Sequence, residues 1–307
     1  MDLTSINPIL LVASIMISAT PILLAAIGEM VVEKAGVLNL GVEGMMITGA
    51  VVGFATAVST GSPALGFAAA ALASAVLSLS FGVLTQILMS NQVATGLGLT
   101  LVGLGLSALI GKPYEGMKSP TLPKLDIPVL GDIPLLGRML FSHDAMVYLS
   151  LLLVLAVWAT LKYTRAGLIL RAVGESHDAA HALGYKVIRI RMTAIFFGGA
   201  CAGLGGAYLS LVRVPQWTEG MTAGAGWIAL AIVVFASWRA ERVLIGAYLF
   251  GGVTVLQLNL QAAGAKVPVE ILSMSPYLIT ILVLVVISAR GAHGAPASLG
   301  RPFHASS

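Results

Sequence analysis

The feature that most constrains this chain is a series of apolar stretches, each close to the length that crosses a lipid bilayer. A hydrocarbon core about 30 Å thick takes roughly 20 helical residues to span. Stretches of about this length recur along almost the whole sequence, with short polar or Gly-rich connections between them. We place nine of them at residues 8–30, 43–58, 65–89, 92–110, 145–161, 192–212, 227–238, 244–260 and 271–288.

Composition excludes a water-soluble fold. Of the 307 residues, 58% are hydrophobic and 10% charged, whereas a soluble domain has about 25% charged residues. Backbone groups in lipid must be satisfied within helices or closed barrels, and the apolar stretches are continuous rather than alternating. We therefore expect an all-α, polytopic helical bundle that forms one transmembrane domain over residues 1–307, with no room for a separate catalytic or nucleotide-binding domain.

Two stretches predict helices that break inside the membrane. Residues 227–238 are short for a full crossing and indicate a half-span or a re-entrant element. Residues 34–44 are rich in glycine and interrupt an otherwise apolar region. Broken helices at membrane depth are tolerated where they line a cavity or pack on protein.

Basic residues set the expected orientation, because Lys and Arg collect in cytoplasmic loops. The loop at about 162–191 carries six of them and only two acids, so we expect it in the cytoplasm; its basic residues are Lys162, Arg165, Arg171, Lys186, Arg189 and Arg191. The loop at about 111–144 balances its charges, contains five prolines and is predicted to be an ordered external loop. If all nine segments cross, the N-terminus is external and the tail at about 290–307 is cytoplasmic.

The cytoplasmic loop contains a short potential helix between Gly174 and Gly184, and Gly184 is placed to end it. Ala179, Ala180 and Leu183 fall on one face of that helix and form an apolar patch with nothing predicted to cover it. The patch is typical of a helix lying on the membrane surface, and the alternative is a helix that docks into a groove on a soluble partner.

His177 and His181 have the spacing of the zinc-protease helix motif, here HDAAH. An Asp replaces the usual Glu, and no third ligand is apparent. We therefore expect solvated histidines and neither a metal site nor a cofactor bound by this chain. A membrane metalloprotease remains an alternative that metal analysis would test.

Polar residues near or within the spans are candidates for a translocation path. Glu43 is expected to pair with Lys34, whereas Asn39 either lines the path or serves structure. The path candidates are Asn39, Phe54, Gln92, Gln257 and Asn259. Each of them is also compatible with simple helix packing. Because no buried pairing of acidic and basic residues is visible in the spans, energy input from a separate subunit is simpler than an ion- or proton-coupled carrier, which remains the alternative.

Four separated blocks resemble one known family. They are KAGVLNLGVEGMM from Lys34, NQVATGLGL from Asn91, YTRAGLILRAVGESHDAAHALGY from Tyr163 and TEGMTAGAGWIALAIVVF from Thr218. Together they resemble the ABC-importer permeases of the ribose and branched-chain amino-acid type, in the nucleoside and simple-sugar branch. The segment 238–242 departs from this likeness, because related chains have an Asn-Pro or Gly-rich turn there.

The resemblance implies a transport subunit without enzymatic activity, in the inner or plasma membrane. It implies a second homologous permease subunit, a cytoplasmic ABC ATPase that hydrolyses the ATP, an extracytoplasmic substrate-binding protein and no nucleic-acid partner. The solute is expected to be a nucleoside, with purines favoured, and otherwise a simple sugar. Coupling to the ATPase is expected at Arg171, Gly174, Glu175, Ala179, Ala180, Leu183 and Gly184.

Overall fold

The computed structural model describes residues 8–125, 140–262, 268–288 and 294–304, and over these residues it is a helical bundle without named strands. Seven helical segments of the described chain are long and apolar enough to cross a membrane. They contain α1 (Pro8–Lys34), α2 (Val42–Thr60), α3 (Pro63–Gly82), α4 (Gln92–Gly111), α6 (Ala145–Tyr163), α9 (Val187–Tyr208) and α11 (Ala240–Ala262). The predicted polytopic all-α bundle is confirmed.

Two further helices correspond to the remaining predicted segments. These are α10 (Ala225–Phe235) and α12 (Val269–Ser288). With 11 residues at 1.5 Å each, α10 is about 16 Å long, roughly half of a hydrocarbon core. Two long helices also end in π-helical turns, α3 in η2 (Val83–Ile87) and α9 in η4 (Leu209–Arg213).

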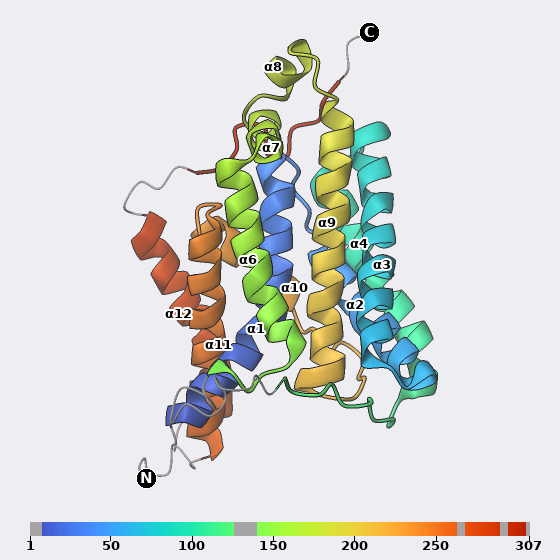
Figure 1. Cartoon of the computed structure of the whole chain (residues 1–307), viewed down its shortest axis with the longest axis vertical. Coiled ribbons are helices and arrows are strands. Elements are labelled where there is room, and N and C mark those ends of the chain that lie inside the picture. Colours follow the sequence, from blue (N-terminus) through green and yellow to red (C-terminus); the bar gives the residue numbers. More distant parts are fainter. Residues whose placement is uncertain (1–7, 126–139, 263–267, 289–293, 305–307) are drawn as a thin grey trace.

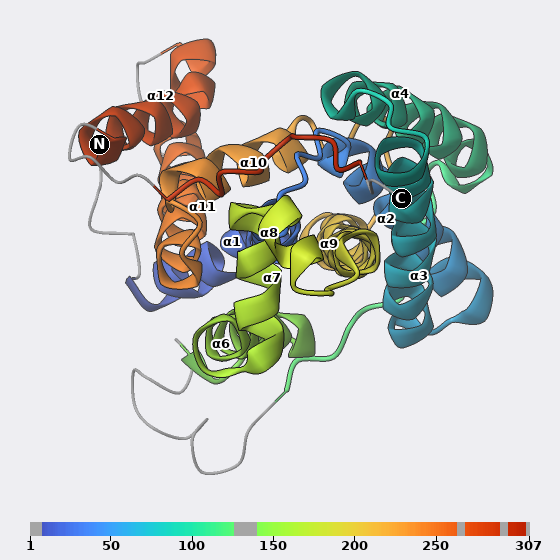
Figure 2. The same cartoon turned by 90° about the horizontal axis from the view of Figure 1, so that it is seen from above.

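The elements lie around a central pair. Seen from above in Figure 2, α1 and α9 are near the middle, α3 and α4 lie on one side and α11 and α12 on the opposite side. The N-terminal end of α1 lies at one end of the bundle in Figure 1. The opposite end holds α7 (Arg165–Glu175), α8 (His177–Ala182) and the C-terminal segment 294–304.

The chain between α1 and α2 is non-helical, as the Gly-rich sequence predicts. Helix α1 ends at Lys34 and α2 starts only at Val42. The start of α2 meets the start of α10, where a Cβ added to Gly226 would lie 2.5 Å from the Glu43 Cα. Helix α10 then lies alongside the second half of α1. At its start, Ala225 lines a cavity together with Ile22 of α1. Just beyond its end, the Trp238 indole donates to the Glu33 carboxylate of α1. The full-length helix α2 and the half-length helix α10 therefore begin next to each other in the interior of the bundle.

Glycines let α9 approach its neighbours closely. A Cβ on Gly49 of α2 would lie 2.5 Å from the Gly203 Cα, and one on Gly206 would lie 1.8 Å from the Met46 carbonyl oxygen. No real side chain fits at such distances. The contact between α2 and α9 is therefore made by backbone against backbone.

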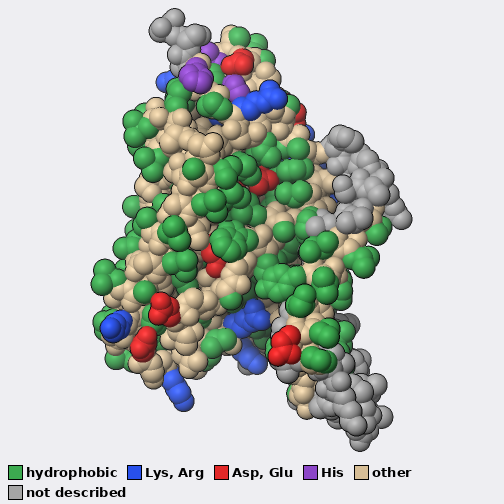
Figure 3. All heavy atoms as spheres, turned by 180° about the vertical axis from the view of Figure 1, so that it is seen from behind, with side chains coloured by type: hydrophobic (Ala, Val, Ile, Leu, Met, Phe, Trp, Pro, Cys, Tyr) green, Lys and Arg blue, Asp and Glu red, His purple; other side chains and the backbone are tan. Residues whose placement is uncertain are grey.

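The surface agrees with a membrane setting. In Figure 3 the face between the two ends is largely hydrophobic, the Lys and Arg side chains gather toward the ends, and His side chains appear at the end that carries α8. The predicted external loop includes η3 (Lys112–Tyr114), and the Tyr114 hydroxyl lies 3.3 Å from that of Ser59 at the end of α2. Residues 126–139 of that loop and residues 290–293 and 305–307 of the predicted tail lie outside the described part of the chain.

Candidate translocation cavity and docking face

Glu43 holds the start of α2 to the start of α10. Its carboxylate accepts hydrogen bonds from the Thr222 hydroxyl at 2.5 Å and from the backbone N–H groups of Gly224 at 2.9 Å and Gly226 at 2.7 Å. These N–H groups belong to the first turn of α10, where a helix has no internal acceptors and favours negative charge. The predicted pairing of Glu43 with Lys34 is therefore wrong, and the Lys34 ammonium instead donates to the Gly294 carbonyl at 3.4 Å.

The segment that departs from the family likeness forms a compact turn. Ser237 and Trp238 adopt positive φ values of 50° and 55°, and the Trp238 indole N–H donates to the buried carboxylate of Glu33. The Arg239 guanidinium and the Glu241 carboxylate then form an exposed ion pair at 2.5 Å. The turn thus connects α10 to the end of α1 and to the start of α11.

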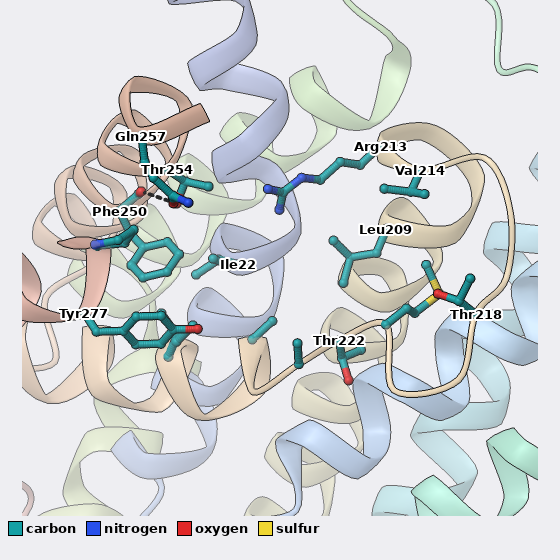
Figure 4. Close-up of a pocket in the computed structure, with 15 residues that line it drawn as sticks. Ile22, Leu209, Arg213, Val214, Thr218, Thr222, Phe250, Thr254, Gln257 and Tyr277 are labelled. Carbon is teal, nitrogen blue, oxygen red and sulfur yellow. Dashed lines mark hydrogen bonds between the residues drawn. The ribbon is translucent and has the colours of Figure 1, made fainter. Parts of the chain in front are cut away.

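A cavity of about 380 Å³ lies beside the start of α10. This size is within the range of about 300–1,000 Å³ usual for small-molecule sites. Its walls come from α1, η4, the 214–224 segment, α10, α11 and α12, and the residues that characterise it are Ile22, Arg213, Thr218, Phe250, Gln257 and Tyr277. Figure 4 shows the Arg213 guanidinium reaching in from one wall, with Phe250, Gln257 and Tyr277 on the other.

Of the five predicted path residues, Gln257 lines this cavity and the other four lie elsewhere. The Asn39 carboxamide oxygen accepts from Gly41 N–H at 2.9 Å, and that of Gln92 accepts from Leu38 N–H at 2.8 Å. Both side chains thus brace the non-helical chain before α2. Asn259 donates to a carbonyl of its own helix, and Phe54 is fully buried. A path role for these four stays a prediction.

Sequence reasoning missed Arg213, Thr218 and Tyr277. Arg213 ends the η4 turn at the far end of the α9 rod from α8, which is the side that the loop charges assign to the exterior. A cation next to a span on that side runs against the usual distribution of Lys and Arg. That mismatch is the signal in the sequence that would have singled it out.

The predicted short helix of the cytoplasmic loop is α8, and it is separated from α7 by a break at Ser176. The Ser176 hydroxyl accepts from Ala179 N–H at 3.3 Å and so caps the start of α8. Gly184 has a φ of 86° just beyond its end, as predicted for the residue that terminates the helix. Gly174 and Glu175, which the prediction placed on this helix, belong to α7.

Of the seven predicted coupling residues, two are buried and five are exposed. Gly174 is buried so closely against the end of α1 that an added Cβ would lie 2.1 Å from the Lys34 carbonyl oxygen. Ala180 is also buried, contrary to the expectation of an uncovered face, because Phe303 packs against it together with Val173 and Val187. Arg171, Glu175, Ala179, Leu183 and Gly184 remain exposed. We call the exposed apolar set Ala179, Ala182, Leu183 and Tyr185 the α8 patch; the exposed fraction of Leu183 is 77%.

The C-terminal segment straps α7 and α8 to the bundle. Ser298 N–H donates to the Gly174 carbonyl at 2.8 Å, and Gly300 N–H donates to the Gly36 carbonyl at 3.2 Å. The Phe303 ring stands between the imidazoles of His177 and His181, with centroids 5.4 and 5.2 Å away. The strap therefore fixes the position of the α8 patch.

Arg191 is the centre of this end of the molecule and is fully buried. Its guanidinium donates to the Ala35 carbonyl, to the Gln86 carboxamide oxygen and to the Arg301 carbonyl, each at 3.1 Å, and approaches the His177 Nδ1 at 3.3 Å. One side chain thus links α9 to the chain after α1, to η2, to the strap and to α8. From the sequence, Arg191 is interpreted only as one of the basic residues that place the loop in the cytoplasm.

His177 is consequently not the solvated histidine that the sequence suggests. Because a guanidinium can only donate, Nδ1 of His177 accepts, and Nε2 carries the proton 3.5 Å from the Asp178 carboxylate. Burial and the neighbouring Arg191 lower the pKa of His177, so the imidazole is neutral at pH 7. Among the described residues no group of three His, Cys, Asp or Glu side chains is placed to hold a metal ion. The absence of a metal site stays a prediction.

A membrane-spanning bundle in which a half-length helix begins beside a cavity with several polar groups in its walls is typical of a solute transport protein. Residues 11–287 match the family model described as the branched-chain amino acid transport system / permease component, and the chain belongs to this family of ABC-importer permeases. It is a multi-pass membrane protein of transport function, as the resemblance in the sequence predicts.

Named relatives cover most of the chain. A Haloferax volcanii protein provisionally named as a glucose ABC transporter permease is 42% identical over 87% of this chain and 88% of its own. The guanosine ABC transporter permease of Bacillus subtilis is 32% identical over 99% and 98%, respectively. The nucleoside ABC transporter permease of Lactococcus lactis is 31% identical over 90% and 91%. No solved structure matches the chain.

Proposed function

We propose that this chain forms the solute path of an ATP-driven importer for nucleosides, with simple sugars as the second choice of solute. The observation that carries the proposal is that the two ends of the bundle have different features. A cavity with several polar groups in its walls lies beside the start of α10, and an exposed apolar patch lies on α8 at the opposite end. The family assignment supplies the class, and the names of the relatives favour nucleosides or glucose over amino acids.

The α8 patch is the proposed contact with a cytoplasmic ATPase. A short helix with exposed apolar side chains fits the groove-binding mode of helix recognition. Its rim carries both signs of charge, with Arg171 and Lys186 on the basic side and Glu175 and Asp178 on the acidic side. The strap and Arg191 hold α8 rigidly, so force applied there would be transmitted to α1 and α9 rather than absorbed by the loop.

The remaining partners and the orientation follow from this assignment. A second homologous permease subunit would complete the membrane channel, and an extracytoplasmic binding protein would deliver the solute. The α8 end and the C-terminal segment face the cytoplasm in the inner or plasma membrane, and the N-terminus faces outward. ATP hydrolysis takes place on the partner chain, and this chain is a transport subunit that binds no cofactor.

Reconstitution tests the proposal. The complex of this chain with its ATPase, partner permease and binding protein should take up radiolabelled nucleoside into proteoliposomes only with ATP on the α8 side. Ala179→Glu places a charge in the α8 patch and should abolish uptake while leaving thermal stability unchanged. Arg165→Glu is the control, because it adds an acid at the start of α7, a helix about 16 Å long whose other end leads into α8. Uptake that survives Ala179→Glu would remove the docking role.

A proton-coupled carrier is the second candidate, and two carboxylates favour it. Glu29 and Glu33 lie one turn apart on α1, each with an exposed fraction of 1%, and one oxygen of Glu29 lacks a hydrogen-bond partner among the described residues. Buried carboxylates of this kind are the usual groups of proton relays. Uptake by the purified chain alone, driven by a pH gradient without ATP, would support the carrier and contradict the importer.

A further inference from the structure

Arg213 is the one Lys or Arg among the residues that line the cavity in the described structure. No hydrogen bond or ion pair connects its guanidinium to another described residue; the side chain is half-buried, and its neighbour Tyr208 is a phenol already donating to Asp144. At the wall of the cavity its N–H donors are partly withdrawn from water, and a polar group that is withdrawn from water needs a hydrogen-bond partner. The group that satisfies it is therefore water or a bound solute.

The chemistry of the guanidinium restricts that solute. Arg offers five N–H donors in a rigid plane, no acceptor, and a permanent positive charge. A cationic solute is repelled by this charge. A solute that turns N–H groups toward Arg213 forms no hydrogen bond with it, because both groups are donors. The favoured solute presents two adjacent acceptors in one plane, because these can be bound by two parallel N–H groups.

The opposite wall adds a second requirement. Phe250 of α11 and Tyr277 of α12 pack edge to face with centroids 5.8 Å apart, and both line the cavity. Figure 4 shows the Tyr277 hydroxyl pointing into the space that the Arg213 guanidinium enters from the other side. Aromatic side chains offer apolar ring faces and edges that pack against a flat ring. A planar solute can therefore contact the aromatic pair while one of its edges faces Arg213.

We propose that Arg213 donates hydrogen bonds to one edge of the purine ring of the solute. This contact makes the cavity selective for 6-oxopurine nucleosides, such as guanosine and inosine, over 6-aminopurine nucleosides, such as adenosine. The O6 and N7 atoms of a 6-oxopurine are two adjacent acceptors that an Arg fork binds bidentately. Adenine replaces O6 with an amino donor, which opposes the guanidinium. Gln257 and Thr218 supply further polar groups for the ribose. This inference rests on the proposed importer function and narrows its solute.

The test is a comparison of uptake ratios in the assembled importer. Initial rates of ATP-dependent uptake of guanosine, inosine and adenosine are measured for wild type and for Arg213→Gln and Arg213→Lys, with the same binding protein throughout. Selection by the binding protein then cancels between wild type and variant. Arg213→Gln should lower the guanosine-to-adenosine ratio about tenfold, the discrimination expected from one bidentate contact. Arg213→Lys keeps the charge but lacks the planar fork, and should lower the ratio nearly as far.

Lys118→Gln removes an exposed charge from the predicted external loop and should leave the ratio unchanged. If Arg213→Gln fails to assemble, the ratio measured with Arg213→Lys decides the question. An equal loss of guanosine and adenosine uptake would assign Arg213 to structure and overturn the inference, as would a preference for GMP over guanosine. In these two cases wild-type uptake still depends on ATP, so the proposed function stands. If wild type takes up no nucleoside with ATP, the nucleoside importer itself is contradicted, and the inference falls with it.

Discussion

The Glu43 carboxylate and the Gly226 backbone N–H are hydrogen-bonded at 2.7 Å, although 183 residues separate them in the sequence. The bond joins the start of α2 to the start of α10, and both helices begin inside the bundle. Thr222 and Gly224 donate to the same carboxylate. One acid therefore fixes how these two helices are placed beside the cavity.

Replacing Glu43 tests this joint. Glu43→Gln keeps the shape, but it loses the charge and turns an NH₂ group toward backbone donors, so we expect a loss of about 3 kcal/mol. The melting temperature of the purified chain in nanodiscs should fall accordingly. Glu219→Gln, an exposed acid in the segment before α10, is the matched control and should melt like wild type. Equal melting of the two variants would show that the cap contributes little.

Close packing of α9 on α2 gives a second prediction. Gly206→Ala would place a Cβ 1.8 Å from the Met46 carbonyl oxygen, so the two helices would have to separate. We expect a destabilisation of about 2 kcal/mol, as for other overpacked sites, measured by thermal unfolding in the same nanodiscs. Gly98→Ala on α4 meets no atom within 4 Å and should be neutral or slightly stabilising. Similar stability of both variants would contradict the backbone contact.

The strap gives a third prediction. Phe303→Ala removes the ring that covers Ala180 and separates His177 from His181, a local loss of about 3 kcal/mol. Hydrogen exchange of residues 177–183 should accelerate, while α1 and α9 stay protected. Arg301→Gln should have no such effect, because Arg301 contributes a backbone carbonyl to the contact with Arg191. Unchanged protection of α8 in Phe303→Ala would mean that the strap does not hold it.

Acidification should loosen the same contact through His177. Burial, Arg191, Arg301 and His304 lower the pKa of His177, and Asp178 opposes them. The unfolded chain, with a histidine pKa of about 6.5, binds the proton more readily, so the stabilisation is present above that pH and is lost as the pH falls below it. Exchange protection of α8, corrected for intrinsic rates, should therefore drop as the pH falls below about 6.5. His177→Gln should remove this pH dependence and the exposed His181→Gln should keep it; the reverse result would locate the titration elsewhere.

The sequence predicts the spans well, because continuous apolar stretches in lipid have few structural options. It also predicts the break before α2, the shortness of α10 and the role of Gly184, since glycine content and segment length are local properties. Partners of charged residues were not predictable in the same way. Glu43 is nine residues from the end of α1, yet it bonds to a loop 179 residues away, and Phe303 covers an alanine that looks exposed in its own segment. Such contacts depend on how distant helices pack.

The cavity shows the same limit. Polar residues near or within the spans, such as Asn39 and Gln92, are natural path candidates, but both brace backbone at the break before α2. Arg213 lies at the end of a span, and its sequence position does not show which way its side chain points. The fold places it in the wall of the cavity opposite Phe250 and Tyr277.

The side of the membrane on which α8 lies tests the central claim most directly. Cys201, the single cysteine, is buried, so after Leu183→Cys the new thiol is the accessible one in the described structure. A membrane-impermeant maleimide should label it in inside-out vesicles and not in intact cells with an external reagent. Labelling from the outside of intact cells would place α8 beyond the reach of any cytoplasmic ATPase and would contradict the importer assignment.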